Sequence, residues 1–111
     1  NILMQVNTSG EASKSGCQPG DAIDLAKSIM QLKNINLVGL MTIGSFSEDE
    51  QIIRSEFTLL RNLKDEINQK LGIQLTELSM GMSHDYKIAI EEGSTILRIG
   101  TAIFGQRTKH I

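Results

Sequence analysis

The chain has 111 residues, enough for one small domain, and its 40% hydrophobic and 22% charged residues are ordinary for a globular protein. The 11 basic and 13 acidic residues are scattered and leave a net charge of −2, which excludes a basic stripe for nucleic acid and a polybasic membrane patch. The single cysteine, Cys17, excludes an internal disulfide and a cysteine-based zinc site. With no secretory segment in the sequence, these features predict a cytoplasmic protein with no nucleic-acid or membrane partner and an inert, free Cys17.

The first half of the chain predicts two strands and a helix between them. Residues 2–6 form an apolar run typical of a buried strand, and because the chain starts at Asn1 inside this pattern, we expect further residues upstream. A covering helix is predicted over residues 21–32. The next strand, residues 35–43, is apolar at nearly every position, which is typical of a central strand covered on both faces.

The second half continues the alternation. The longest helix is predicted to begin at a capping box made by Ser47 and Glu50 and to end at Gly72. A strand, a short helix with Ser83 as its N-cap, and a last strand follow over residues 75–80, 84–92 and 95–99.

This order of elements predicts an α/β fold with about four βα units and parallel strands. The pattern fits either half of an eight-stranded barrel or most of a small doubly wound sheet, and it does not choose between them. A half barrel would leave two strand edges unpaired, so its missing strands would come from upstream residues or from another chain.

Residues 78–107 are the most informative stretch, because two neighbouring strands end there in glycine and a hydroxyl residue. Ser83 follows one strand, and the pair Gly100 and Thr101 follows the other. Backbone N–H groups and hydroxyls at the carboxyl ends of parallel strands can bind a phosphate. For Ser83 the alternative is a plain helix cap, and for Gly100 it is a tight turn.

Arg98 lies among apolar residues in the last predicted strand, where a fixed cation needs a partner. It either forms a structural ion pair with Glu77 or Asp85, or donates to a ligand beside the predicted phosphate site. Asp85 itself either orients Ser83 or Arg98, or is an acid in the first turn of the helix.

Two other candidates are rejected. The polar run at residues 7–16 contains Lys14 and Ser15 but lacks the glycines of a P-loop, so it predicts a solvated loop that can at most add a donor such as Asn7 to the site. The two histidines, His84 and His110, lack the spacing of a metal site, so no metal is expected.

The chain resembles the carboxy-terminal half of the YggS/PROSC family of pyridoxal 5′-phosphate (PLP) homeostasis proteins over essentially its whole length. The resemblance rests on VNTSGEASKSG, GLMTIG, LSMGMSHD and GSTILRIGTAIFGQR, which begin at Val6, Gly39, Leu78 and Gly93. The last two are highly specific when they occur together at this spacing. The family fold is a (β/α)8 barrel similar to the amino-terminal domain of alanine racemase, so the resemblance implies that residues 1–111 are a partial PLP-binding barrel domain whose amino-terminal half is missing.

The resemblance also implies roles for particular residues. Ser83, Gly100 and Thr101 would bind the cofactor phosphate, and Arg98 would face the pyridine nitrogen and disfavour its protonation. Ser79 and Met80 would line the same wall. The family's Schiff-base lysine lies in the missing half, and no lysine of this chain matches it.

The function implied is that of a PLP carrier or buffer in vitamin B6 homeostasis without robust catalytic turnover, and thus not an enzyme. The alternative is a PLP-dependent amino-acid racemase of the alanine-racemase type, which takes a catalytic tyrosine from a second domain that this chain does not contain. A third possibility, a sugar-phosphate enzyme on a similar barrel, would need acid and base carboxylates at strand ends, and none stands out.

Overall fold

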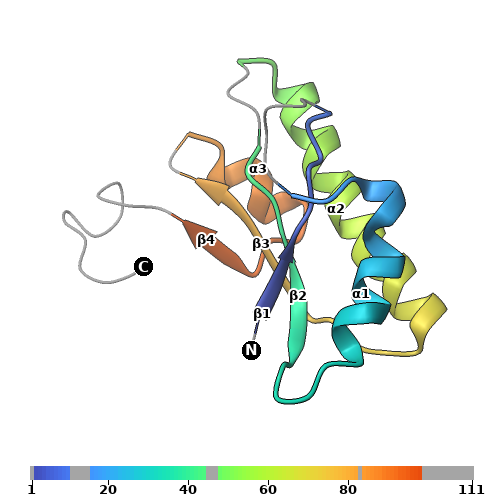
Figure 1. The fold of residues 1–111 in the computed structure, drawn as a ribbon. Helices are drawn as coiled ribbons and strands as arrows, with labels where there is room; N and C mark the ends of the chain where they lie inside the picture. The colour runs from blue at the N-terminus through green and yellow to red at the C-terminus, as the bar shows by residue number, and fades with distance from the viewer. Residues whose placement is uncertain (1, 11–15, 45–47, 83, 99–111) are drawn as a thin grey trace.

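The computed structural model describes residues 2–10, 16–44, 48–82 and 84–98, without the side chain of Arg98. In this part of the chain a parallel sheet has the strand order β1-β2-β3-β4 (Figure 1). Its strands are β1 (Ile2–Gln5), β2 (Leu37–Met41), β3 (Glu77–Met82) and β4 (Ile96–Arg98). The connecting helices are α1 (Ala22–Met30, preceded by the short 3-10 helix η1, Pro19–Asp21), α2 (Glu50–Leu71) and α3 (Tyr86–Glu91). The predicted alternation, the parallel sheet and the inner position of the second strand are confirmed.

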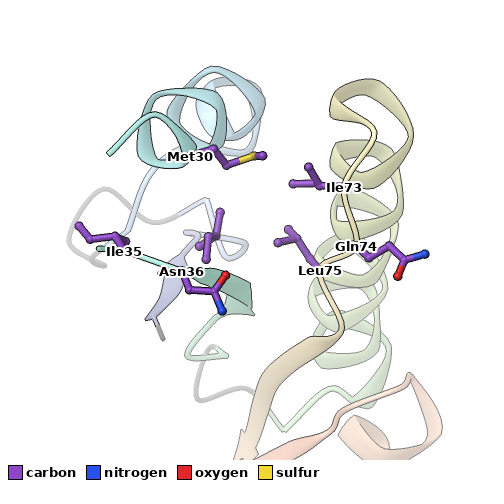
Figure 2. A pocket seen from close by; sticks show the side chains of 7 residues that line it. Met30, Ile35, Asn36, Ile73, Gln74 and Leu75 are labelled. Carbon is purple, nitrogen blue, oxygen red and sulfur yellow. The ribbon is translucent and has the colours of Figure 1, made fainter. Parts of the chain in front are cut away.

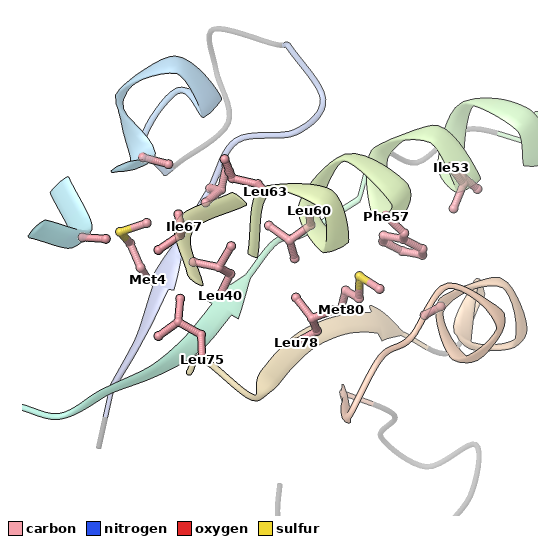
Figure 3. Packing of buried hydrophobic residues seen from close by; sticks show 14 residues of the cluster. Met4, Leu40, Ile53, Phe57, Leu60, Leu63, Ile67, Leu75, Leu78 and Met80 are labelled. Carbon is pink, nitrogen blue, oxygen red and sulfur yellow. The ribbon is translucent and has the colours of Figure 1, made fainter. Parts of the chain in front are cut away.

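The hydrophobic core lies between the sheet and the helices. Figure 3 shows Leu40 of β2 and Leu78 and Met80 of β3 pointing toward Phe57 and Leu60 of α2. All five side chains are at most 1% exposed. Because side chains alternate along a strand, the residues between them face the other side of the sheet. The sheet therefore has one face packed on helices and a second face that carries the alternate side chains of its strands.

The start of α2 differs from the prediction. The N-cap is Asp49, whose carboxylate accepts a hydrogen bond of 2.9 Å from the N–H of Gln51, so the helix begins at Glu50. The predicted start with Ser47 as N-cap is wrong, because Asp49 occupies the N-cap position and its carboxylate satisfies the free N–H of Gln51. Ser47 itself lies outside the described residues. Gly72, with φ of 66°, ends the helix in the left-handed conformation as predicted.

The start of α3 also differs. Asp85 occupies the N-cap position and the helix begins at Tyr86, two residues after the predicted start. The carboxylate of Asp85 turns back and accepts a hydrogen bond of 2.7 Å from the N–H of Met82. This contact leaves residues 84–85 in a turn, so the prediction of a helix capped by Ser83, which is not among the described residues, placed the start too early.

The other end of α3 is fixed to α2 by Glu92. Its carboxylate lies 2.8 Å from Arg54 Nη1 and 3.1 Å from Arg61 Nη1, and it accepts a hydrogen bond of 2.7 Å from the hydroxyl of Thr58. The Thr58 hydroxyl and the Arg54 guanidinium lower the pKa of Glu92, against burial, which raises it. Hydrogen bonds to Glu91 and Glu92 raise the pKa of Arg54. Charged groups on two helices thus fasten α3 over the core.

Candidate functional site

The carboxyl ends of β1 and β2 are joined by buried hydroxyls. The Oγ1 atoms of Thr8 and Thr42 lie 2.9 Å apart, and Thr42 donates a hydrogen bond of 2.8 Å to the carbonyl of Val6. Since the Thr42 proton is used on Val6, Thr8 is the donor between the two hydroxyls. Asn7 Oδ1 accepts hydrogen bonds from the N–H and hydroxyl of Ser9. These contacts make a rigid, polar edge at the end of the sheet where parallel α/β proteins bind ligands.

The end of β3 contains a bulge at Gly81. Ser79 of β3 pairs with Ile96 of β4, and Met82 pairs with Arg98. The chain therefore advances three residues on β3 over the same distance in which it advances two on β4. Gly81 has φ of 106°, and a Cβ placed on it would lie 2.6 Å from Ala89 Cβ and 2.8 Å from Leu97 Cδ2. Only glycine fits this position without displacing its neighbours. The bulge redirects the chain where β3 leaves the sheet, as bulges beside binding sites do.

Asp85 closes the turn that follows this bulge. Its side chain is 1% exposed, and its second carboxylate oxygen, Oδ2, lies 3.2 Å from His84 Nε2. A Cβ placed on Gly44, at the end of β2, would lie 3.5 Å from the same oxygen. One buried carboxylate therefore contacts the end of β3 and the turn before α3, and it lies close to Gly44 in the segment after β2.

Two cavities lie at different places on the sheet. One, of about 330 Å³, adjoins the turn after β3, and its lining carries both signs of charge: Glu50, His84, Asp85, Tyr86, Lys87 and Ile88. The other, of about 250 Å³, is shown in Figure 2, where Met30 of α1 and Ile73 reach toward each other. It also includes Asn36 and Leu75, which precede β2 and β3, so it lies at the opposite end of the strands. Of these two cavities in the described part of the chain, the first lies at the edge where ligands bind in this class of fold.

The structure separates two of the predicted site residues. Met80 is fully buried in the core against α2, whereas Ser79, 3% exposed, precedes it on the strand and so faces the other side of the sheet. The two side chains do not line one wall. The backbone of Arg98 pairs with Met82 at the end of β4. Ser83, Gly100 and Thr101 lie outside the described residues, as do Lys14, Ser15 and His110.

The two carboxylates considered as partners for Arg98 have other contacts. Glu77 accepts hydrogen bonds of 3.0 and 2.8 Å from the hydroxyls of Thr76 and Thr95. Asp85 contacts Met82 and His84 as described above. The prediction of an ion pair between Arg98 and either carboxylate remains a prediction, since the Arg98 side chain is not described.

Sequence reasoning missed the role of Asp85 and the hydroxyl pair of Thr8 and Thr42. The first has no motif in the sequence, because a capping box needs Ser or Thr three residues before the acid, where this chain has Met82. No local sequence pattern indicates the contact between Thr8 and Thr42, because the two residues are 34 positions apart.

Cys17 is a free thiol, and its partial burial raises the pKa of the thiol. The thiol is therefore protonated and unreactive near neutral pH. Among the described residues, His, Cys, Asp and Glu form no group of three or more that could bind a metal. Within the same ranges, every helix is too short or too polar to cross a bilayer.

Comparison with known proteins assigns the family. Residues 1–108 match the family described as alanine racemase, N-terminal domain. The chain belongs to this family. A relative in Vibrio cholerae, named pyridoxal phosphate homeostasis protein, is 52% identical over 106 residues, and a human protein of the same name is 47% identical over 110 residues. The resemblance to the family of PLP homeostasis proteins found in the sequence is thereby confirmed.

One solved structure that is similar to this chain contains PLP. The structure of PipY from Synechococcus elongatus with PLP bound matches 93% of this chain with a TM-score of 0.78 and 31% sequence identity. This chain spans 48% of that protein, and 44% and 40% of the Vibrio cholerae and human relatives. It thus covers less than half of each protein.

Proposed function

We propose that the full-length protein carrying this chain binds PLP and acts as a carrier or buffer of the cofactor in cytoplasmic PLP homeostasis. The observation that carries the proposal is the match to the PLP-bound PipY structure across 93% of this chain. The names of the Vibrio cholerae and human relatives point to the same function. The strands are parallel and end at one edge of the sheet, where proteins of this fold class bind phosphate-bearing ligands.

The proposal includes the architecture. Residues 1–111 form the carboxy-terminal half of a (β/α)8 barrel, and the amino-terminal half, or a second chain, supplies the other strands. Two observations support this: the sheet is parallel with one face packed on helices, and the chain spans only 44% of the length of the Vibrio cholerae relative. The same missing half would supply the lysine that bonds to PLP.

Within this half, the proposed roles follow the carboxyl edge of the sheet. Ser83, Gly100 and Thr101 bind the phosphate, and Arg98 faces the pyridine nitrogen. Ser79 lines the cofactor wall on the sheet face opposite the helices, and Met80 supports that wall from the core. PLP, when bound, supplies a ring that withdraws electrons from an attached amine, and a guanidinium at its nitrogen keeps that effect modest.

The proposal is tested by titrating the full-length protein with PLP and following the absorption of the ring. Loss of one charge-assisted phosphate contact in Ser83→Ala should weaken binding by about 10- to 100-fold. Ser28→Ala, at an exposed position of α1, is the matched control and should bind as wild type does. Arg98→Ala should change the spectrum more than the affinity. A wild-type protein that does not bind PLP would overturn the function, and a Ser83→Ala variant with unchanged affinity would overturn the site.

A racemase is the second candidate, because the matching family takes its name from alanine racemase. The two functions are separated by a racemisation assay on several amino acids. The carrier function predicts turnover far below that of a dedicated racemase, and comparable turnover would contradict it.

A further inference from the structure

The cavity of about 250 Å³ at the amino ends of β2 and β3, here called the amino-end cavity, has an uncharged lining. Met30 of α1, Ile73 and Leu75 point into the same space in Figure 2. No charged residue belongs to the part of the lining that the structure describes, in contrast to the cavity at the carboxyl edge. The amino-end cavity is smaller than the pockets of about 300–1,000 Å³ that bind drug-sized ligands. It therefore fits one or two apolar side chains better than a cofactor.

Apolar side chains are exposed beside the amino-end cavity. Met30 and Ile35, which line it, are 43% and 40% exposed, and Leu32, between them in the sequence, is 53% exposed. A single exposed apolar residue is ordinary, whereas a group of them beside a cavity marks an interaction surface. Such a group is typical of a surface that another segment covers.

The start of β1 lies against this cavity. The N–H of Ile2 donates a hydrogen bond of 2.8 Å to the carbonyl of Asn36, and Ile2 pairs with Leu37. Asn36 and Leu37 both line the amino-end cavity. Residues that lead into β1 in the full-length protein therefore pass beside the cavity, and a few residues of about 3.3–3.6 Å each are enough to cross it.

The βα repeat indicates what kind of segment leads into β1. β2 follows α1 after residues 31–36, and β3 follows α2 after residues 72–76. Each of these connections contributes an apolar side chain to the cavity, Ile35 in the first and Ile73 in the second. In a βα repeat a helix and a short connection of the same kind lead into β1. The Vibrio cholerae relative has the length for such a segment, since this chain spans only 44% of it.

We propose that the amino-end cavity binds an apolar side chain of the upstream segment, which is the connection that immediately precedes residue 1 in the full-length protein. This proposal rests on the proposed function and its architecture, in which residues 1–111 are the carboxy-terminal half of the barrel. The contact joins the two halves of the protein at the end of the strands opposite the cofactor edge. It is stabilised by burial of the exposed apolar surface of Met30 and Ile35.

Photo-crosslinking of the full-length protein tests which segment occupies the cavity. Met30 is replaced by a photo-reactive benzophenone amino acid, and mass spectrometry identifies the peptide to which it becomes joined. The expected product is a crosslink within one chain to the upstream segment. The same replacement at Leu59, which is 38% exposed on α2 and outside the cavity lining, is the matched control and should give no such crosslink.

Three results of this experiment overturn the proposal. One is a crosslink to a second copy of the chain, which is recognised in a mixture of unlabelled and isotope-labelled protein. Another is the absence of any crosslink from position 30 to the upstream segment. The third is a crosslink to the upstream segment that forms equally well from position 59.

Hydrogen exchange measures whether the contact holds the upstream segment in place. Met30→Glu puts a charge at the cavity, and burial of that charge is unfavourable, so amide exchange in the upstream segment should become about 10-fold faster. Leu59→Glu makes the same change at a comparable exposure and should leave this exchange rate as in wild type. An unchanged rate in Met30→Glu overturns the proposal.

PLP titration separates this proposal from the proposed function. Met30→Glu should bind PLP as wild type does, because the amino-end cavity and the cofactor edge lie at opposite ends of the strands. A wild-type protein that forms the upstream crosslink but does not bind PLP overturns the proposed function alone. A wild-type protein that binds PLP, in which position 30 gives no upstream crosslink, overturns the present proposal alone.

Discussion

The two ends of α3 are each fixed by a buried carboxylate, yet the two carboxylates bind different kinds of group. Glu92, after the helix, contacts the side chains of Arg54, Thr58 and Arg61 on α2. Asp85, before the helix, accepts a hydrogen bond from the backbone of β3. The first contact fastens one helix to another, and the second sets the path of the chain at the edge of the sheet.

The difference between the two carboxylates follows from the chemistry of their partners, which are arginine side chains for Glu92 and a backbone N–H for Asp85. Long side chains such as arginine lose rotamer freedom when they pair, and their half-exposed guanidiniums are screened by water and salt. A backbone N–H is already ordered and has only one direction in which to donate. We infer that the Glu92 end tolerates change, whereas the Asp85 end requires accurate geometry.

The largest expected effect is at the Asp85 end, in Gly81→Ala. The added methyl would overlap Ala89 Cβ of α3 and occupy a residue with φ of 106°, so the free energy of unfolding of the full-length protein should fall by about 3 kcal/mol. Urea unfolding measures this loss. Gly72→Ala is the matched control: its φ is also positive, at 66°, but nothing lies within 4 Å of an added Cβ, so it should cost only about 1 kcal/mol. Equal losses in the two variants would show that overlap at Gly81 contributes nothing.

A smaller effect is expected at the Glu92 end. Glu92→Gln keeps an acceptor for Thr58 but removes the charge facing the two arginines, and should lower the free energy of unfolding by about 1 kcal/mol. Thermal or urea unfolding measures it. Glu66→Gln is the control, since Glu66 pairs with Lys70 at 3.9 Å on the exposed side of α2, and little change is expected. A loss at Glu92 as large as that of Gly81→Ala would contradict the comparison.

The smallest expected effect is the pH dependence contributed by Glu92. Its pKa is lowered in the folded state, so folding gains stability from this group above the ordinary pKa of a glutamate and loses it as pH falls through the folded pKa. The difference in melting temperature between wild type and Glu92→Gln should therefore shrink as pH is lowered from about 6 to about 3. A difference that stays constant over this range would rule out the ionised carboxylate as its source.

Much of the fold was predictable, because it depends on local chemistry. Continuous apolar runs identified the strands, and the apolar stripe of α2 and Gly72 located the longest helix and its end. The helix starts were less predictable, since Ser47, Asp49 and Glu50 are all residues that favour a helix N-terminus. Geometry selected Asp49, whose carboxylate reaches the N–H of Gln51.

The sequence by itself determined the order of the elements, the parallel sheet and the family, because apolar periodicity and short motifs are properties of adjacent residues. Only the tertiary structure decided that Met80 belongs to the core, that Gly81 forms a bulge against Ala89, and that Asp85 ties the end of β3 to the start of α3. The same holds for Glu92, whose contacts with Arg54 and Thr58 join residues 38 and 34 positions apart. The physical reason is that such contacts depend on the direction of a side chain and on what packs against it, which are set only when distant segments meet.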